Sequence, residues 1–245
     1  MRNINQDNFW CAGHFLKSEN DGLESPESGK ADCANYPAFA VFDGMGGEQY
    51  GEMAAYIAAE TFDTLQKSKK NTDTKNFLLD SFKQMNGKIT AYEKQNSLGC
   101  VGTTAAMIIF GKKEICACNV GDSKIYHYHH GDKNLVQISK DHVMDIFGKK
   151  KPPLTQFLGI PESEFFIEPH ISHGLYSDGD YYLICSDGLT DMLSEDEIKK
   201  TIAQNGDVGR CVERLLESAL DSGGRDNITI ILCKIIRQKI LFGII

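Results

Sequence analysis

The stretch Pro37-Ala-Phe-Ala-Val-Phe-Asp-Gly-Met-Gly-Gly47 decides the fold, because it joins an apolar run to an aspartate and a glycine-rich turn. The apolar run is typical of a buried strand that ends at Asp43. Gly44 lets the backbone turn sharply, and the following glycines lead into a segment with helical periodicity. By itself the pattern favours a strand–turn–helix junction with an N-cap aspartate. A metal-binding role therefore needs support from other segments.

Four other short segments place an aspartate where a turn or a strand end is expected, and these residues are Asp7, Asp122, Asp187 and Asp226. Two carboxylates about 4 Å apart repel by roughly 4 kcal/mol at an effective dielectric near 20, so a fold that gathers all five needs cations between them. Oxygen ligands without His or Cys favour magnesium or manganese over zinc. Each segment alone is a weak signal, since a turn aspartate explains it about equally well.

Composition limits the class of protein. The 245 residues are 41% hydrophobic and 24% charged, which is enough for a large core without disulfides, and no linker divides the chain, so we expect a single domain over residues 1–245. The net charge of -8 argues against binding to nucleic acid. No apolar run is long enough for a membrane span, and the N-terminus is too polar for a signal peptide. The eight cysteines lack a C-x-x-C pair and lie mostly in apolar runs, which indicates a reduced, cytoplasmic setting.

Hydrophobic periodicity predicts a β–α–β–α–β order. We expect two helices at 48–67 and 73–95, two more at 194–203 and 208–220, and strands at 9–16, 37–42, 103–110, 114–120, 124–128, 135–139, 165–171, 181–185 and 227–235. Tight turns between neighbouring strands favour antiparallel sheets, and hence a layered α+β domain with a β-sandwich flanked by helices. Residues 18–35 are interpreted as a mobile hairpin loop. The apolar tail 235–245 is interpreted as an edge strand or a disordered end, with a partner or membrane contact as the alternative.

Histidines 127, 129 and 130 alternate along a strand into a turn. A metal site is one interpretation of this pattern, but a solvated hairpin is favoured.

Taken together and in order, the aspartate segments resemble the metal-dependent serine/threonine protein phosphatases, also called the type 2C or PPM family, and in particular their bacterial branch. The resemblance covers nearly the whole chain and rests on eight ordered segments: Arg2…Asp7, Phe42-Asp-Gly-Met-Gly-Gly47, Gly102-Thr-Thr-Ala105, Asn119-Val-Gly-Asp-Ser123, Ser139-Lys-Asp-His142, Leu154-Thr-Gln-Phe-Leu-Gly159, Ser186-Asp-Gly-Leu189 and Gly224-Arg-Asp-Asn227. It implies a four-layer αββα fold.

The resemblance also implies roles for individual residues. Two Mn2+ or Mg2+ ions would be bridged by Asp43, with the Gly44 carbonyl, Asp187 and Asp226 as further ligands. Asp7 would hold metal waters, Asp122 with Asp187 would serve a third, weaker ion, and Asn227 would support Asp226. Arg2 would grip the substrate phosphate, although it lies unusually close to the start of the chain. The aspartates 43, 187 and 226, with Arg2, would be the catalytic set.

The implied function is hydrolysis of phosphoserine and phosphothreonine on proteins by direct attack of a metal-bridging water. The partners would be phosphorylated proteins, substrates of a cognate Ser/Thr kinase, and we expect a cytoplasmic monomer. Two alternatives stay open, namely a phosphatase-like signalling or binding module without strong turnover, and a phosphatase for small phosphate esters.

Overall fold

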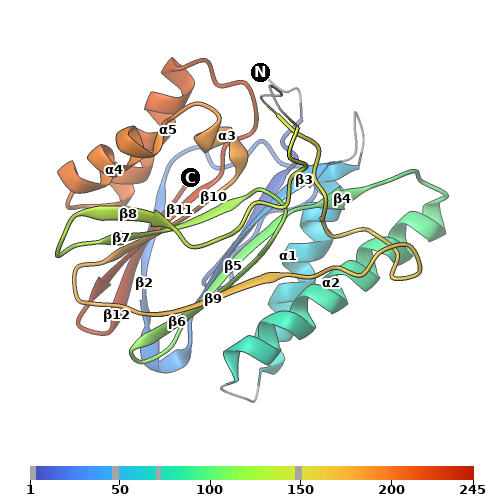
Figure 1. Cartoon of the computed structure of the whole chain (residues 1–245), viewed down its shortest axis with the longest axis horizontal. Helices are drawn as coiled ribbons and strands as arrows, with labels where there is room; N and C mark the ends of the chain where they lie inside the picture. Colours follow the sequence, from blue (N-terminus) through green and yellow to red (C-terminus); the bar gives the residue numbers. More distant parts are fainter. Residues whose placement is uncertain (1–3, 46–49, 70–72, 147–150) are drawn as a thin grey trace.

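The computed structural model describes residues 4–45, 50–69, 73–146 and 151–245, and within these ranges the strands form two antiparallel sheets (Figure 1). The first sheet has the order β1-β3-β5-β6-β9, and β4 pairs with the end of β3. Its strands are β1 (Asp7–Cys11), β3 (Ala38–Met45), β4 (Gly102–Thr103), β5 (Ala105–Phe110), β6 (Glu114–Val120) and β9 (His170–Leu175).

The second sheet has the order β2-β12-β11-β10-β7-β8. Its strands are β2 (Glu27–Asp32), β7 (Lys124–His129), β8 (Asn134–Gln137), β10 (Tyr181–Cys185), β11 (Ile230–Ile236) and β12 (Lys239–Ile244). The continuous burial of β10 and most of β11 follows from their central place, since both faces of each strand are covered.

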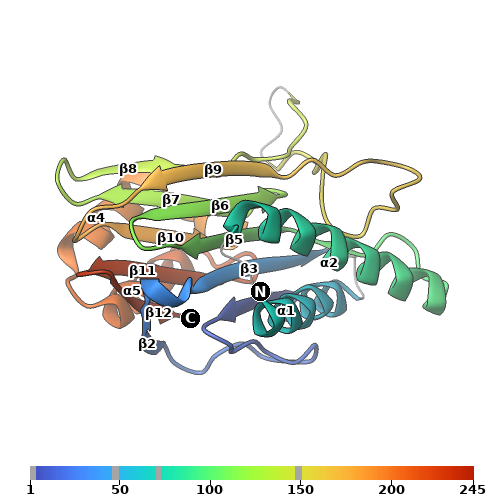
Figure 2. The ribbon, with the colours of Figure 1, turned by 90° about the horizontal axis from the view of Figure 1, so that it is seen from below.

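Helices cover the two outer faces of the sandwich (Figure 2). The long α1 (Gly51–Ser68) and α2 (Thr74–Asn96) pack on the first sheet, while α4 (Glu195–Gln204) and α5 (Val208–Asp221) pack on the second. The short α3 (Asp187–Thr190) follows β10, and a 3-10 turn η1 (Cys33–Asn35) follows β2. The predicted four-layer αββα architecture is therefore confirmed.

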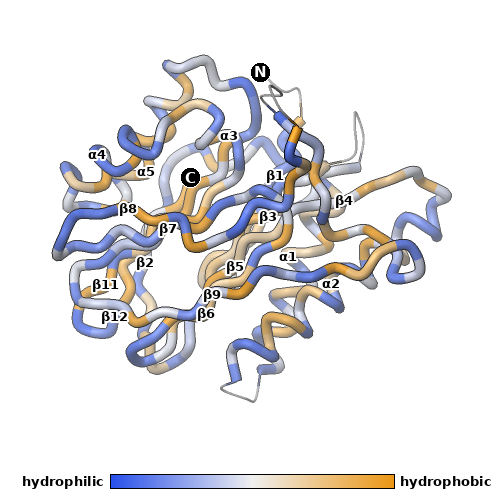
Figure 3. The backbone as a smooth tube through the Cα atoms, viewed as in Figure 1, coloured by the Kyte–Doolittle hydropathy of each residue, from blue (hydrophilic) through white to orange (hydrophobic). Residues whose placement is uncertain are grey.

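Three buried clusters correspond to the three gaps between the layers. One lies between α1, α2 and the first sheet, one between the two sheets, and one between the second sheet and α4 and α5. Figure 3 shows apolar segments along the strands of the two sheets, which lie between these clusters. The two sheets are therefore packed on both faces, and the five aspartates lie at or next to the ends of their strands.

The structure corrects the expected loop at residues 18–35, and it confirms a strand in the tail but not at an edge. The segment expected to be a mobile loop contains β2, and the apolar tail forms β12, which lies between β11 and β2 instead of at an edge. β2 and β12 pair through backbone hydrogen bonds, with Ile240 opposite Ala31 and Ile244 opposite Glu27. The apolar residues of the tail are needed because β12 lines the core between the sheets.

Other differences are local. The expected strand at 103–110 is interrupted at Thr104, which divides it into β4 and β5, and the expected strand from 165 begins only at His170. No helix in the described ranges is long and apolar enough to cross a membrane.

Candidate active site

Asp7 and Asp43 face each other across the first pair of strands. β1 and β3 are antiparallel, and their register places Asp7 directly opposite Asp43. Asp7 is buried, and its Oδ2 accepts hydrogen bonds from Ser186 Oγ and Thr229 Oγ1, each at 2.7 Å. These two donors come from the second sheet, so Asp7 ties the two halves of the sandwich together beneath the site.

The backbone at Asp43 is fixed by two threonines. Its N–H donates to Thr104 Oγ1 at 3.1 Å, and its carbonyl oxygen accepts from Thr103 Oγ1 at 3.0 Å and from the Thr104 N–H at 2.9 Å. Thr104, at the break between β4 and β5, therefore forms hydrogen bonds with the backbone of Asp43 in β3. Gly44 is also required, since a Cβ there would overlap the backbone of Gln6 and Gly51.

Asp187 and Asp226 reach the site from the second sheet. Asp187 is the first residue of α3, directly after β10, and Asp226 lies in the turn before β11. The two turns touch, because a Cβ at Gly188 would overlap the carbonyl oxygen of Asn227. The Asn227 side chain in turn accepts a hydrogen bond from the Gln6 N–H at 3.1 Å, so the last aspartate turn is attached to the start of β1.

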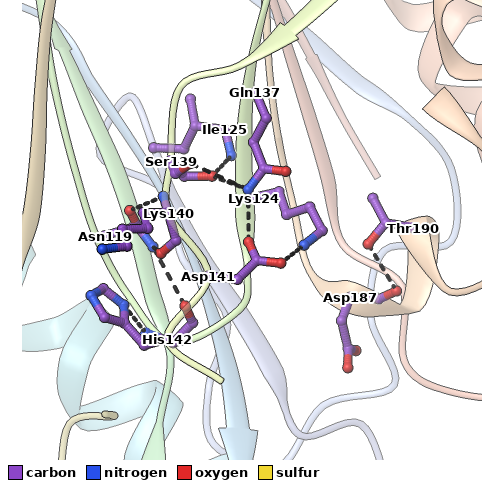
Figure 4. A network of polar contacts seen from close by, with 11 residues as sticks. Asn119, Lys124, Ile125, Gln137, Ser139, Lys140, Asp141, His142, Asp187 and Thr190 are labelled. Carbon is purple, nitrogen blue, oxygen red and sulfur yellow. Dashed lines mark hydrogen bonds and ion pairs between the residues drawn. The ribbon is translucent and has the colours of Figure 1, made fainter. Parts of the chain in front are cut away.

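Asp122 lies in the turn between β6 and β7, and a polar network fixes this turn (Figure 4). His142 and Gly121 exchange two hydrogen bonds, from the Gly121 N–H to His142 Nδ1 at 3.3 Å and from the His142 N–H to the Gly121 carbonyl at 3.0 Å. Asn119 holds both backbone groups of Lys140 at 3.0 and 2.8 Å. The segment Ser139–His142 thus serves as a brace for the turn.

Lys124 begins β7 and forms an ion pair with Asp141 in the same network (Figure 4). Gln137 Nε2 donates to the other oxygen of Asp141 at 2.7 Å. Thr104 Oγ1 also contacts Ser123 Oγ at 2.6 Å, which connects the Asp122 turn to the Asp43 turn.

Burial, together with mutual repulsion, raises the pKa values of Asp43, Asp7 and Asp122. Desolvation raises the pKa of Asp43 well above its usual range, and Asp7, Asp187, Asp122 and Asp226 all add repulsion. Burial likewise raises the pKa of Asp7 to about 6 and that of Asp122 to about 6, with Asp187 contributing in both cases. Within the residues that the structure describes, burial and mutual repulsion therefore oppose the ionised form of these carboxyl groups.

Among the described residues, the ammonium group of Lys151 enters this cluster. Lys151 Nζ lies 2.5 Å from Asp187 Oδ2, 3.2 Å from Asp226 Oδ2 and 3.7 Å from Asp191 Oδ2. Burial opposes the charge on Lys151, but the hydrogen bond and the charge of Asp187, together with Asp226, outweigh burial and raise the pKa of the ammonium group. The lysine shows where the cluster accommodates a positive charge.

The residues fit a divalent metal ion. The donor set contains only oxygen, which suits magnesium or manganese. Asp187 Oδ1 is buried and finds no hydrogen-bond partner in the part of the chain that the structure describes, which is costly unless a cation or water meets it. The ammonium of Lys151, held between Asp187 and Asp226, acts as a stand-in for a cation at the same carboxylates.

The structure brings together all the predicted aspartates, with Gly44 and Asn227 beside them, but their roles as ligands stay predictions. Arg2 lies outside the described residues. Sequence reasoning missed Lys151 and Asp191. Asp191 is visible in the Asp187-Gly-Leu-Thr-Asp191 spacing, which places two carboxylates one helical turn apart. Lys151 carried no local signal, because it lies in an irregular segment rich in lysine and proline.

Comparison with known proteins shows to which family the chain is similar. A family model described as protein phosphatase 2C matches residues 28–227. The serine/threonine protein phosphatase PstP of Mycobacterium tuberculosis is 29% identical over 208 residues, which cover 80% of this chain but only 40% of PstP. The serine/threonine phosphatase Stp of Listeria welshimeri is 29% identical over 220 residues, covering 81% of this chain and 84% of that protein.

Solved structures share the fold. The catalytic domain of PstP, crystallised in complex with two manganese ions, superposes with a TM-score of 0.70 at 24% identity and covers 90% of this chain and 97% of that one. The serine/threonine phosphatase Stp1 of Staphylococcus aureus gives a TM-score of 0.72 at 20% identity, over 100% of this chain and 95% of that one. The family match spans the strand ends that carry Asp43, Asp122, Asp187 and Asp226, and on this ground the chain belongs to the protein phosphatase 2C family.

Proposed function

We propose that this chain is a metal-dependent phosphatase that hydrolyses phosphoserine and phosphothreonine on proteins. The single observation that carries the proposal is the cluster of five aspartates at the strand ends of both sheets, in which Asp187 Oδ1 has no hydrogen-bond partner among the described residues. A cluster of buried carboxylates is costly to fold, and perturbed carboxyl groups of this kind are typical of functional sites.

Asp43, the Gly44 carbonyl, Asp187 and Asp226 would hold two Mn2+ or Mg2+ ions, and Asp122 with Asp187 would serve a third. Such ions make a water more acidic and stabilise the negative charge that develops on a phosphate ester during hydrolysis. The chain's own contribution is to hold these carboxylates in place before the substrate arrives. Thr103 and Thr104 fix the Asp43 backbone in this way, and Ser186 and Thr229 fix Asp7.

Asp7 suits a supporting role. The hydroxyl groups of Ser186 and Thr229 both donate to one oxygen, Oδ2, and Oδ1 would accept from metal-bound water. Asn227 links Asp226 to the start of β1, since its backbone N–H donates to Asp226 Oδ1 at 3.0 Å while its side chain accepts from Gln6. Arg2 would bind the substrate phosphate as a planar fork.

The wider setting is also part of the proposal. The substrates would be phosphorylated proteins that a cognate Ser/Thr kinase produces, and the protein would act as a monomeric single domain over residues 1–245. The eight cysteines are all free, and seven of them are buried, which is compatible with a reduced, cytoplasmic setting.

The test is hydrolysis of a phosphothreonine peptide by the full chain with Mn2+. We expect turnover that a chelator abolishes and that Asp187→Asn reduces by at least about a hundredfold, because one metal ligand and its charge are lost. Asp221→Asn changes an exposed carboxylate at the end of α5 and serves as the matched control with unchanged activity. Turnover that persists in chelator would contradict the metal mechanism.

Two further measurements separate the alternatives. A binding module would take up Mn2+ in calorimetry and yet leave the phosphopeptide intact. A small-ester phosphatase would hydrolyse a sugar phosphate with a kcat/KM at least equal to that for the peptide. We expect neither result, since the structure brings all five predicted aspartates together and the chain belongs to the protein phosphatase 2C family.

A further inference from the structure

A second group of metal-ligating side chains lies away from the aspartate cluster. His127 and His129 on β7 and Asp180 just before β10 each offer one ligand atom, and these three atoms lie within 4.8 Å of one another. His127 lies three residues along β7 from Lys124, a rise of about 10 Å, whereas Asp122 lies in the turn that precedes the strand. The group therefore cannot share an ion with the aspartates.

The strand geometry explains why the two histidines meet. Side chains alternate along β7, so Tyr126 and Tyr128 enter the core under α4 and α5 while His127 and His129 share the opposite face. The two imidazole rings lie 3.8 Å apart between centroids, and the His127 ring stacks on Tyr182 at 4.3 Å. The solvated hairpin expected from the sequence is wrong for His127, which is only 7% exposed.

Asp180 is fixed before any ligand arrives. Its Oδ2 contacts His127 Nε2 at 2.9 Å and accepts from the Ser177 N–H at 2.8 Å, while Oδ1 accepts from the His130 N–H at 2.9 Å. The carboxylate is almost fully buried. Because two backbone donors hold it, the carboxylate keeps its position if the contact with His127 is exchanged for another one.

The protonation states suit a metal. Burial lowers the pKa of His127, with His129 adding repulsion, so its imidazole is neutral near pH 7. Burial opposes ionisation of Asp180, but the N–H groups of His130 and Ser177 outweigh it and lower the pKa of the carboxyl. A neutral imidazole and an ionised carboxylate are the forms that coordinate metal ions. Opposite the ionised Asp180 the His127 Nε2 carries the imidazole proton, so coordination through Nε2 would move that proton to Nδ1.

We infer that His127, His129 and Asp180 form a second metal site, selective for a zinc-like transition ion, on the β7–β10 face remote from the aspartate cluster. Two nitrogens and one oxygen suit Zn2+, whereas the all-oxygen aspartate cluster suits Mg2+ or Mn2+. Tetrahedral bonds of about 2.0–2.1 Å separate neighbouring ligand atoms by roughly 3.3 Å. The 2.9 Å contact between His127 and Asp180 opens by only about 0.4 Å to reach that value.

The inference does not depend on the proposed phosphatase activity, and its test measures binding. Zn2+ is titrated calorimetrically into the full chain with excess Mg2+ present to fill the all-oxygen cluster. We expect one additional Zn2+ equivalent and a rise in Tm with Zn2+ for the wild type. His129→Ala is expected to weaken this binding at least about tenfold and to abolish the rise, because one of three ligands is lost.

His130→Ala is the matched control, since His130 is the adjacent exposed histidine and its side chain is not part of the group. It is expected to keep both the Zn2+ equivalent and the rise in Tm. The cysteines are identical in all three proteins, so zinc bound by thiols cancels in the comparison. Equal Zn2+ binding by wild type and His129→Ala, or equal loss in both variants, would overturn the inference. Matching Tm values without zinc confirm that the variants fold.

Discussion

Asp7 is a buried carboxylate, and its surroundings change its pKa in opposite directions. Ser186 and Thr229 stabilise its charge, but burial dominates and raises its pKa from 3.8 to about 6. Because the pKa is higher in the folded than in the unfolded state, the folded protein binds more protons between these two values. Stability is therefore fully retained at low pH, in respect of this group, and decreases as the pH rises through that window.

The direction of this pKa shift predicts how the stability of the metal-free protein depends on pH. In chelator, the Tm is expected to fall between about pH 4 and pH 6, and Mn2+ is expected to restore it at the upper end because the cation replaces the lost protons. Asp7→Asn should reduce the slope, since the amide oxygen still accepts from both hydroxyls but carries no charge. Thermal unfolding across the pH range checks this, with exposed Asp21→Asn as the control. A slope that is the same in Asp7→Asn and wild type would contradict the assignment.

Lys151 and a metal ion require the same carboxylates. Its ammonium lies against Asp187 and Asp226, so a divalent ion at these oxygens has to displace it. We expect Lys151→Ala to bind Mn2+ several-fold more tightly, because no internal cation has to leave, and to have a lower Tm than wild type in chelator, because the aspartates then repel without compensation. Calorimetry and thermal unfolding measure the two effects.

Lys200→Ala removes an exposed lysine of α4 and should change neither quantity. Weaker Mn2+ binding by Lys151→Ala would show that the lysine assists the ion instead of competing with it. This contact could not be predicted from the sequence, because it depends on the path of an irregular segment. The aspartates, in contrast, were recognisable from a local pattern in which a strand ends on Asp and a small residue.

At the scale of elements, the site depends on close approaches between turns. Gly188 in α3 has no room for a Cβ because the Asn227 carbonyl lies against it, whereas Gly87 in the middle of α2 has open space around it. Gly188→Ala should therefore push the Asp187 and Asp226 turns apart, lowering both the Tm and the affinity for Mn2+. Gly87→Ala should raise stability by up to about 1 kcal/mol, since alanine is the better helix former.

Unfolding and calorimetry on these two variants check the expected opposite signs. A Gly188→Ala protein with unchanged Mn2+ affinity would show that the two turns do not depend on each other. The sequence predicted both turns as separate Asp-Gly and Arg-Asp-Asn signals, but it could not predict their contact. Segments almost forty residues apart meet here only because β10 and β11 are neighbours in the second sheet.

At the scale of the whole molecule, local patterns predicted the helices and the central strands, because these have clear periodicity and continuous burial. They failed for β2 and for the place of β12 in the sheet, because the pairing of these two strands joins residues some two hundred positions apart. β2 is polar, since one of its faces meets solvent, and its sequence therefore resembles a loop. The short apolar tail is compatible with several structures until β2 and the core between the sheets select one.

The tail should accordingly contribute to global stability and not to the chemistry. Phe242 of β12 lies with its ring 5.3 Å from that of Phe39, and its ring fills the space over Gly29 of β2. Phe242→Ala is expected to lower the free energy of unfolding by about 3 kcal/mol, because a large buried ring is replaced by a cavity.

Urea unfolding measures this, and Mn2+ affinity of the folded variant should remain that of the wild type, since β12 lies two strands away from β10. Leu220→Ala, at an exposed apolar position of α5, is the control with little loss. A stable Phe242→Ala protein would mean that β12 adds little to the sandwich, and the apolar tail would then need the partner that the sequence left open.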